Sequence, residues 1–148
     1  MYLVDSFERH LEPIYFHHEQ AASMAAEGYS KVSGKLGVVC VTSGPGGTNA
    51  LTGVLGQWTD SVPVLYLSGN VRTQMSSKGT ALRQRGDQEN DIVRMVEGIT
   101  KEAIYCCDHT TVLCGLNNAI YAAKNGRKGP VWVDIPLDIQ CYEIGDNR

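Results

Sequence analysis

Residues 19–49 decide the fold, and they read EQAASMAAEGYSKVSGKLGVVCVTSGPGGTN. The pattern of small and apolar residues predicts a helix near 19–33, and the apolar run at 37–42 predicts a strand. A glycine-rich loop follows that strand and opens a second helix near 48–58. In a parallel sheet, such a loop lies at the carboxyl end of its strand, where ligands commonly bind. We therefore expect Glu19 to face this loop across a ligand pocket.

The rest of the chain alternates between strand and helix patterns, without internal repeats or a linker that would separate two domains. Continuous apolar runs such as VVCV and VLYL predict strands that are covered on both faces. Strands separated by helices predict a doubly wound, mainly parallel α/β sheet with helices on both faces. The chain opens on a helical segment at 1–9. The expected strands are 14–16, 37–42, 64–68, 102–106 and 131–135, and the expected helices lie near 19–33, 48–58, 89–97 and 110–124.

The composition is typical of a soluble globular domain. The 148 residues are 43% hydrophobic and 20% charged, which suits one domain with its own core. A net charge of −3 offers no basic surface that would indicate nucleic acid or a membrane as a partner. No apolar run reaches the ~18 residues of a membrane span. The five cysteines include no CxxC pair, so we expect free thiols and a cytoplasmic protein.

The segment SGPGGTN at residues 43–49 joins the strand to the next helix. Backbone N–H groups at such a junction can bind phosphate. The segment matches neither GxGxxG nor GxxxxGK(S/T), and Pro45 has no N–H group, so the usual phosphate-binding loops are excluded. The glycines would instead let a flat ligand approach the backbone closely. A tight turn with a purely structural role is the alternative.

Two simpler explanations compete for Glu19. A carboxylate in the first turn of a helix is favoured by the helix dipole by up to ~1 kcal/mol, whatever else it does. His17 and Glu19 also form the H-x-E part of a zinc-deaminase motif, but the chain lacks the P-C-x-x-C segment that this motif requires. We therefore expect no zinc site at His17 and His18. Neighbours at the end of a strand face opposite ways, so one of the two imidazoles should be packed inside the fold.

Residues 70–87 form a long polar connection with several basic side chains. Long connections within a compact domain are usually functional or mobile. Exposed basic side chains are also common on solvated loops, where each contributes little to stability. Both interpretations stay open for the basic residues Arg72, Lys78, Arg83 and Arg85.

Four ordered blocks of the chain identify a family. They are HHEQAASMAAEGYSKVSGKLGVVCVTSGPGGTN, DSVPVLYLSGNV, GITKEAI and GRKGPVWVDIPLDIQ. Together they resemble the aminopyrimidine-binding (Pyr) domain of thiamine-diphosphate enzymes, and within that family the acetolactate (acetohydroxyacid) synthase branch. The resemblance implies that residues 1–140 are one Pyr domain and that residues 141–148 are a tail leading to a further domain.

The resemblance implies a catalytic role for Glu19. In this family the equivalent glutamate hydrogen-bonds N1′ of the cofactor's aminopyrimidine ring and shares a proton there. This exchange activates the thiazolium carbon for attack on a 2-keto acid. A carboxylate is needed because an amide could bond to N1′ but could not supply the proton.

The other site residues also follow from the resemblance. A glutamine after the long loop is implied to point into the site. Counting back from Ile99 selects Gln88, whereas counting forward from Gly79 selects Gln84, and we favour Gln88. The residues implied to line the aminopyrimidine side of the pocket are Thr42, Pro45, Gly46 and Asn49.

The family pattern has parts that this chain does not show. The family's Pyr domain begins with a helix, a strand and a VPGG-like turn before the segment that matches residue 1, so we expect an N-terminally incomplete domain that lacks its first strand. The diphosphate-binding domain, with its GDG…N magnesium motif, is not found either. The resemblance thus implies thiamine diphosphate as cofactor, with Mg²⁺ held by a diphosphate-binding domain outside this chain.

The expected partners follow from this half-site. In the family the cofactor lies between the Pyr domain of one subunit and the diphosphate-binding domain of its partner. We expect a homo-oligomer, a dimer or larger, or a complex with a separate diphosphate-binding domain or subunit. The substrate would be a 2-keto acid, and the chain alone would be inactive. The alternative is a non-catalytic truncated relic, or a dimerisation or interaction module that retains the fold.

Overall fold

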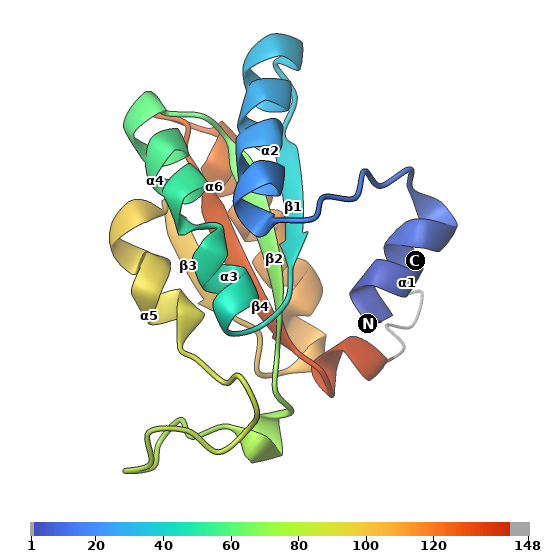
Figure 1. Cartoon of the computed structure of the whole chain (residues 1–148), viewed down its shortest axis with the longest axis vertical. Coiled ribbons are helices and arrows are strands. Elements are labelled where there is room, and N and C mark those ends of the chain that lie inside the picture. Colours follow the sequence, from blue (N-terminus) through green and yellow to red (C-terminus); the bar gives the residue numbers. More distant parts are fainter. Residues whose placement is uncertain (1, 143–148) are drawn as a thin grey trace.

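Four strands, all parallel, form the centre of the computed structural model, which describes residues 2–142 (Figure 1). Their spatial order is β1-β2-β4-β3, with Gly37 opposite Val64 and Leu65 opposite Val131. The predicted parallel α/β sheet is thereby confirmed. The strands are β1 (Gly37–Val41), β2 (Val64–Asn70), β3 (Glu102–Tyr105) and β4 (Val131–Pro136).

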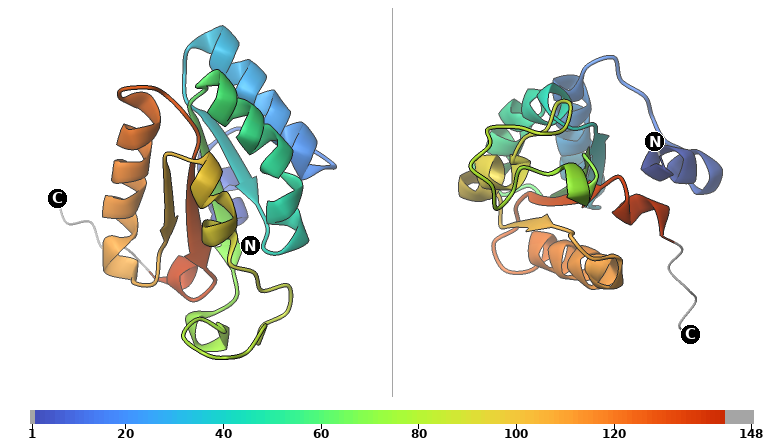
Figure 2. Two further views of the ribbon diagram at one scale, coloured as in Figure 1. Left: turned by 90° about the vertical axis from the view of Figure 1, so that its left-hand side faces the viewer. Right: turned by 90° about the horizontal axis from the view of Figure 1, so that it is seen from below.

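Helices cover both faces of this sheet (Figure 2). One face carries α2, α4 and α5, and the other carries α6 together with α1. The helix expected near 48–58 is divided into α3 and α4. Among the described residues, none of the helices combines the length and the apolar character that crossing a membrane requires. The helices are α1 (Tyr2–His10), α2 (Glu19–Ser33), α3 (Pro45–Asn49), α4 (Leu51–Asp60), α5 (Ile92–Val96) and α6 (Val112–Lys124).

The centre and the edge of the sheet differ in burial. All six residues of β4 are buried, and Tyr66 of β2 stacks on Trp132 of β4 with ring centroids 4.8 Å apart. The VLYL run is therefore covered on both faces, as predicted. The VVCV run is not, because β1 lies at the edge and the side chain of Val38 is 54% exposed.

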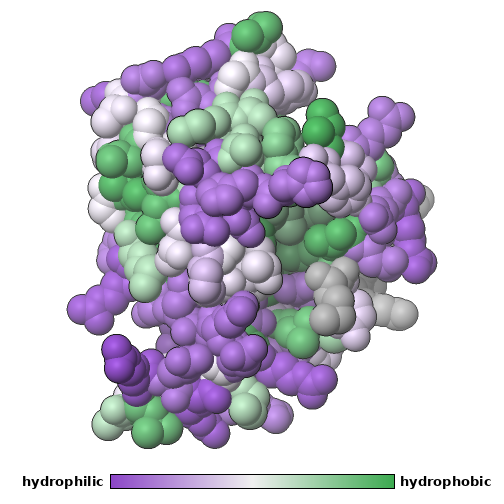
Figure 3. Space-filling model, viewed as in Figure 1, coloured by the Kyte–Doolittle hydropathy of each residue, from purple (hydrophilic) through white to green (hydrophobic). Residues whose placement is uncertain are grey.

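Residues 14–16 form no strand, so this prediction is wrong. They connect α1 to α2 with exposed side chains, and Ile14 is 81% exposed. A strand needs a neighbour that pairs with its backbone, and none of the described strands pairs with this segment. The Tyr15 hydroxyl instead donates a 2.6 Å hydrogen bond to the Glu8 carboxyl group. Hydrophobic atoms are visible at the surface between β1 and α1 (Figure 3).

Helix α2 is fixed at both ends and along its side, which sets the position of Glu19. The Nδ1 atom of His18 accepts a hydrogen bond from the N–H group of Gln20 at the start of the helix. The helix stops at Gly34, whose left-handed φ of 70° closes the last turn. On its buried side, α2 packs so closely on α4 that a Cβ atom at Gly53 would overlap Ser23.

Candidate functional site

The glycine-rich turn follows β1 directly and leads into α3. Gly44 adopts φ 61° and ψ −128°, a conformation that is open to glycine but rare for other residues. A Cβ atom at Gly44 would also lie 2.6 Å from the carbonyl oxygen of Gln88. Glycine is therefore needed here both for the backbone angle and for the approach of a second segment. Pro45 is exposed and begins α3, where its missing N–H group is not needed.

The carboxyl group of Glu19 reaches this turn from the first residue of α2. Its Oε2 atom accepts a 3.1 Å hydrogen bond from the side-chain amide of Asn49. Its Oε1 atom would lie 3.2 Å from a Cβ atom at Gly46, and that Cβ atom would also collide with Thr42. The structure thus brings Glu19, Thr42, Gly46 and Asn49 together at one end of β1.

Helix capping does not account for this position of Glu19. The N-cap hydrogen bond of α2 is made by His18. The half-buried carboxyl group of Glu19 instead contacts Asn49 on another helix. Within residues 2–142 its Oε1 atom accepts no hydrogen bond. One carboxylate oxygen is therefore available to a ligand at the turn, although the carboxylate also benefits from the helix dipole.

The two candidate glutamines lie in different surroundings. Gln88 has a positive φ of 54°, and its carbonyl group contacts Gly44. Its side chain is exposed. Gln84 donates a 2.8 Å hydrogen bond to the carbonyl oxygen of Gly86 within its own loop. Gln88 is thus next to the turn, and its contact with a cofactor stays a prediction.

Both histidines before α2 are exposed, so the expected packing of one imidazole is wrong. The reason is the missing strand at 14–16, since without a strand there are no alternating faces. The ring of His18 caps α2. No group of three or more His, Cys, Asp or Glu side chains suited to a metal ion lies among the described residues.

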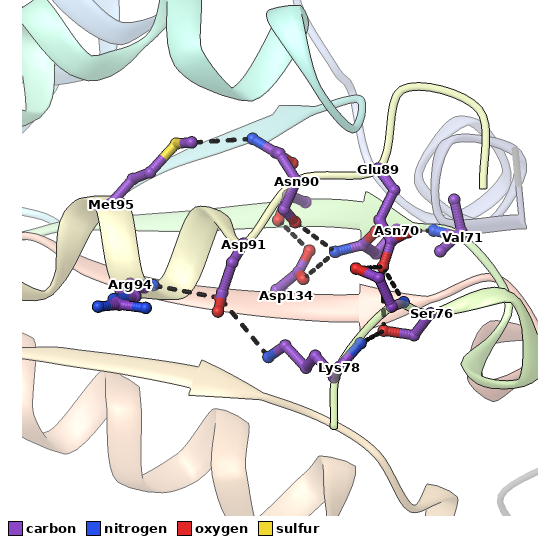
Figure 4. A network of polar contacts seen from close by, with 12 residues as sticks. Asn70, Val71, Ser76, Lys78, Glu89, Asn90, Asp91, Arg94, Met95 and Asp134 are labelled. Atoms are coloured by element: carbon purple, nitrogen blue, oxygen red, sulfur yellow. Dashed lines mark hydrogen bonds and ion pairs between the residues drawn. The ribbon is translucent and has the colours of Figure 1, made fainter. Parts of the chain in front are cut away.

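A buried carboxyl group lies on β4, on the far side of β2 from β1, and the sequence patterns did not predict it (Figure 4). Asp134 of β4 is 1% exposed, and both of its oxygens accept 2.6 Å hydrogen bonds, one from Ser68 and one from Asn70. Burial raises the pKa of Asp134 to about 6, although these two hydrogen bonds act in the opposite direction. The signal was a polar residue at the end of each apolar run, Asn70 after VLYLSG and Asp134 after VWV.

A second carboxyl group organises the loop that precedes α5. Glu89 accepts hydrogen bonds from five donors: the side chains of Ser76 and Ser77 and the backbone N–H groups of Ser77, Arg85 and Gly86. Burial raises the pKa of Glu89, but the hydrogen bonds outweigh it and lower the pKa to about 2. Nothing in the sequence pattern distinguishes Glu89 from a surface acid.

Lys78 of the same loop is held at two points. Its ammonium group lies 3.7 Å from the centre of the Tyr105 ring and 3.6 Å from a carboxylate oxygen of Asp91. Both partners are close to the carboxyl end of the sheet, so this basic side chain helps to tie the loop down. Lys78 is therefore held by the fold and is not simply a solvated side chain on a surface loop.

The arrangement of a carboxylate opposite a glycine turn can be compared with known families. Residues 1–95 match the family model described as thiamine pyrophosphate enzyme, N-terminal TPP binding domain. The chain belongs to this family. The match confirms the resemblance drawn from the sequence blocks, and the four-stranded parallel sheet of the described residues is consistent with a Pyr-type fold.

Members of the thiamine pyrophosphate enzyme family resemble this chain over most of its length. This chain is 40% identical over 134 residues to the acetolactate synthase large subunit of Lactococcus lactis subsp. lactis (strain IL1403). The matched region covers 90% of this chain and 22% of that protein. It is 41% identical over 128 residues to the Haemophilus influenzae large subunit, covering 86% and 21%. Against acetolactate synthase isozyme 3 large subunit of Escherichia coli (strain K12), the identity is 37% over 129 residues, covering 87% and 21%. The chain spans about a fifth of the length of these relatives.

The residues at the turn suit the aminopyrimidine ring of the family's cofactor. A flat ring needs a surface without side chains, and at Gly46 a Cβ atom would occupy the space beside Oε1 of Glu19. Glu19 presents one carboxylate oxygen at this surface, which a ring nitrogen carrying a proton could bind. Asn49 holds the other oxygen and so fixes the orientation of the carboxyl group.

Proposed function

We propose that this chain supplies the aminopyrimidine half of a thiamine diphosphate site in an acetolactate synthase-type enzyme that acts on 2-keto acids. The observation that carries the proposal is the carboxyl group of Glu19, which faces Gly46 with one oxygen bound to Asn49 and the other free to accept a ligand. Family membership and the identity to acetolactate synthase large subunits support the same assignment.

Each residue at the turn has a separate task in this proposal. Glu19 holds the proton that is shared with N1′ of the ring, and Asn49 orients its carboxyl group. Gly46 leaves room for the ring, while Thr42, Pro45 and Gln88 line its rim. When bound, the cofactor supplies a thiazolium carbon that adds to the carbonyl group of a 2-keto acid and accepts electrons as carbon dioxide leaves.

The site is completed by a second protein component in this proposal. The diphosphate group and Mg²⁺ would be held by a diphosphate-binding domain of another chain or subunit. The chain alone would then be inactive, and its active form would be an oligomer or a complex.

Complementation tests this proposal. The chain would be mixed with a separately produced diphosphate-binding domain of an acetolactate synthase, thiamine diphosphate, Mg²⁺ and pyruvate, and carbon dioxide release would be measured. We expect activity that requires both proteins. The Glu19→Gln variant should lose about 100-fold or more of the rate, because it removes a group that transfers a proton.

Glu27→Gln is the matched control. Glu27 lies on the same helix two turns further on and pairs with Lys31, away from the turn, so its substitution should leave the rate unchanged. If Glu19→Gln were as active as this control, Glu19 would be limited to a structural role. A mixture in which even the wild-type chain gives no carbon dioxide release would instead favour an interaction module with the family fold.

A further inference from the structure

The backbone of the glycine-rich turn is held by a residue from a distant part of the chain. The N–H group of Gly44 donates a 3.2 Å hydrogen bond to Oδ1 of Asn90. Gly44 is buried, and a buried N–H group without a partner is costly. The next residue, Pro45, begins α3 and has no N–H group, so among the described residues the Gly44 bond is the last that a backbone N–H group makes before the helix.

Asn90 is itself fixed to the sheet by the buried polar network (Figure 4). The side-chain amide of Asn70 donates one hydrogen bond to Asp134 and another, of 3.3 Å, to the carbonyl oxygen of Asn90. Asn70 is 9% exposed and Asp134 is 1% exposed. The backbone of Asn90 is therefore tied to the end of β2 and, through Asn70, to the buried strand β4.

The loop side provides a second anchor. The neighbouring residue Glu89 binds the N–H groups of Ser77, Arg85 and Gly86, which closes the loop into a compact unit. The carbonyl oxygen of Gln88 lies 2.6 Å from the place that a Cβ atom at Gly44 would take. Asn90 thus lies between the loop that Glu89 closes and the sheet, and its side chain accepts the hydrogen bond from Gly44 of the turn.

We propose that Asn90 is a positioning residue, which holds Gly44 in its unusual conformation and so presents Gly46 to the carboxyl group of Glu19. The Asn70–Asp134 pair is the support on which Asn90 rests. The consequence for cofactor affinity rests on the proposed function, whereas the consequence for the turn can be measured in the chain alone.

Hydrogen exchange of the Gly44 amide tests this role directly. Asn90→Ala should accelerate exchange at Gly44 by about tenfold or more, because the amide loses the acceptor that it has within residues 2–142. Amides in β2 and β4 should exchange as in the wild type. Asn90→Asp keeps an acceptor oxygen and should preserve the protection of Gly44. Asn117→Ala, at an exposed position on α6, is the matched control and should change neither.

The same variants would be compared for apparent thiamine diphosphate affinity in the mixture with the diphosphate-binding domain, where Asn90→Ala should bind several-fold more weakly. The inference is overturned if Gly44 exchanges at the wild-type rate in Asn90→Ala. It is also overturned if the amides of β2 and β4 accelerate as much as Gly44 in Asn90→Ala. The same holds if Gly44 exchange accelerates but Asn90→Ala binds the cofactor as tightly as the wild type. A wild-type mixture that does not bind the cofactor would instead contradict the proposed function, and the exchange rates would still decide the role of Asn90.

Discussion

Two carboxyl groups lie at the carboxyl end of the same sheet, and their surroundings are opposite. Asp134 is buried, and both of its oxygens are bound by Ser68 and Asn70. Glu19 is half-buried, with one oxygen bound by Asn49 and the other free of protein donors within residues 2–142. A fully bonded carboxylate holds the fold together, whereas one with a spare oxygen is available to a ligand.

The largest expected difference between the two regions is in stability. Asp134→Ala would leave the Ser68 hydroxyl and the Asn70 amide without their acceptor, so the free energy of unfolding should fall by roughly 2–5 kcal/mol. Glu19→Ala removes one partly exposed hydrogen bond and should cost about 1 kcal/mol or less. Urea unfolding followed by circular dichroism at pH 7 measures both. Equal losses of unfolding free energy in the two variants would contradict the distinction between the fully bonded carboxyl group of Asp134 and the partly bonded one of Glu19.

The buried member of the pair also predicts a pH dependence. Burial raises the pKa of Asp134 from 3.8 to about 6, so the folded state holds this proton more tightly than the unfolded state. The protonated Asp134 therefore contributes roughly 3 kcal/mol to the free energy of unfolding. This contribution is fully present below about pH 4 and is lost as the pH rises through about 6. Lys78 acts against this shift and Asp91 adds to it, and the pKa values of the neighbouring Tyr105 and Cys106 are also raised.

Asp134→Asn isolates this contribution. The unfolding free energies of the variant and the wild type would be measured from pH 4 to pH 7. The wild type should show an additional decline over this range, which comes from Asp134 and which the variant lacks. An identical slope in both proteins would mean that Asp134 does not titrate in this range.

Glu89 sharpens the comparison, since it is fully bonded but has the opposite pH dependence. Its pKa is lowered from 4.5 to about 2, so its contribution to stability is present above pH 4.5 and is lost as the pH falls through about 2. Glu89→Gln places amide hydrogens opposite backbone donors. We expect the local opening free energy at Ser77 and Gly86 to fall by about 1–2 kcal/mol at pH 7. Hydrogen exchange measures this, with Glu97→Gln as control; unchanged protection would mean that Glu89 does not order the loop.

Much of the fold could be predicted because buried strands leave a local signal. The apolar runs of β2 and β4 are covered on both faces, and the chain pattern shows this directly. The segment 14–16 has the same kind of signal, but whether it pairs depends on a neighbouring backbone that no local pattern encodes. Val38 differs for the same reason, because its exposure is set by the position of β1 at the edge.

The candidate site could be predicted where its residues lie close together in the sequence. Gly46 and Asn49 share one short motif, and Glu19 precedes it by one helix and one strand, so a family resemblance could place them together. Their contact with a cofactor stays a prediction. Asn90 could not be predicted, because it meets Gly44 across 46 residues through a side chain on an irregular loop.

The smallest effect on stability is expected at β1, which lies at the edge of the sheet and is partly exposed, unlike the buried strand β4. Val38 on β1 is 54% exposed, and an unpaired edge with apolar side chains favours association. We expect the wild-type chain to self-associate in sedimentation experiments and Val38→Glu to associate less, with a change in unfolding free energy within about 0.5 kcal/mol. A wild-type chain that stays monomeric at high concentration would contradict this expectation.

The most direct test of the central claim observes the nitrogen that Glu19 is proposed to contact. Thiamine diphosphate labelled with ¹⁵N at N1′ would be bound to the chain in the presence of a diphosphate-binding domain and Mg²⁺, and its ¹⁵N resonance recorded. With the wild-type chain we predict that the N1′ resonance moves away from its free position toward that of a protonated ring nitrogen. With Glu19→Gln, under saturating cofactor, it should not make this move. The same shift in both proteins would contradict a proton shared between Glu19 and N1′.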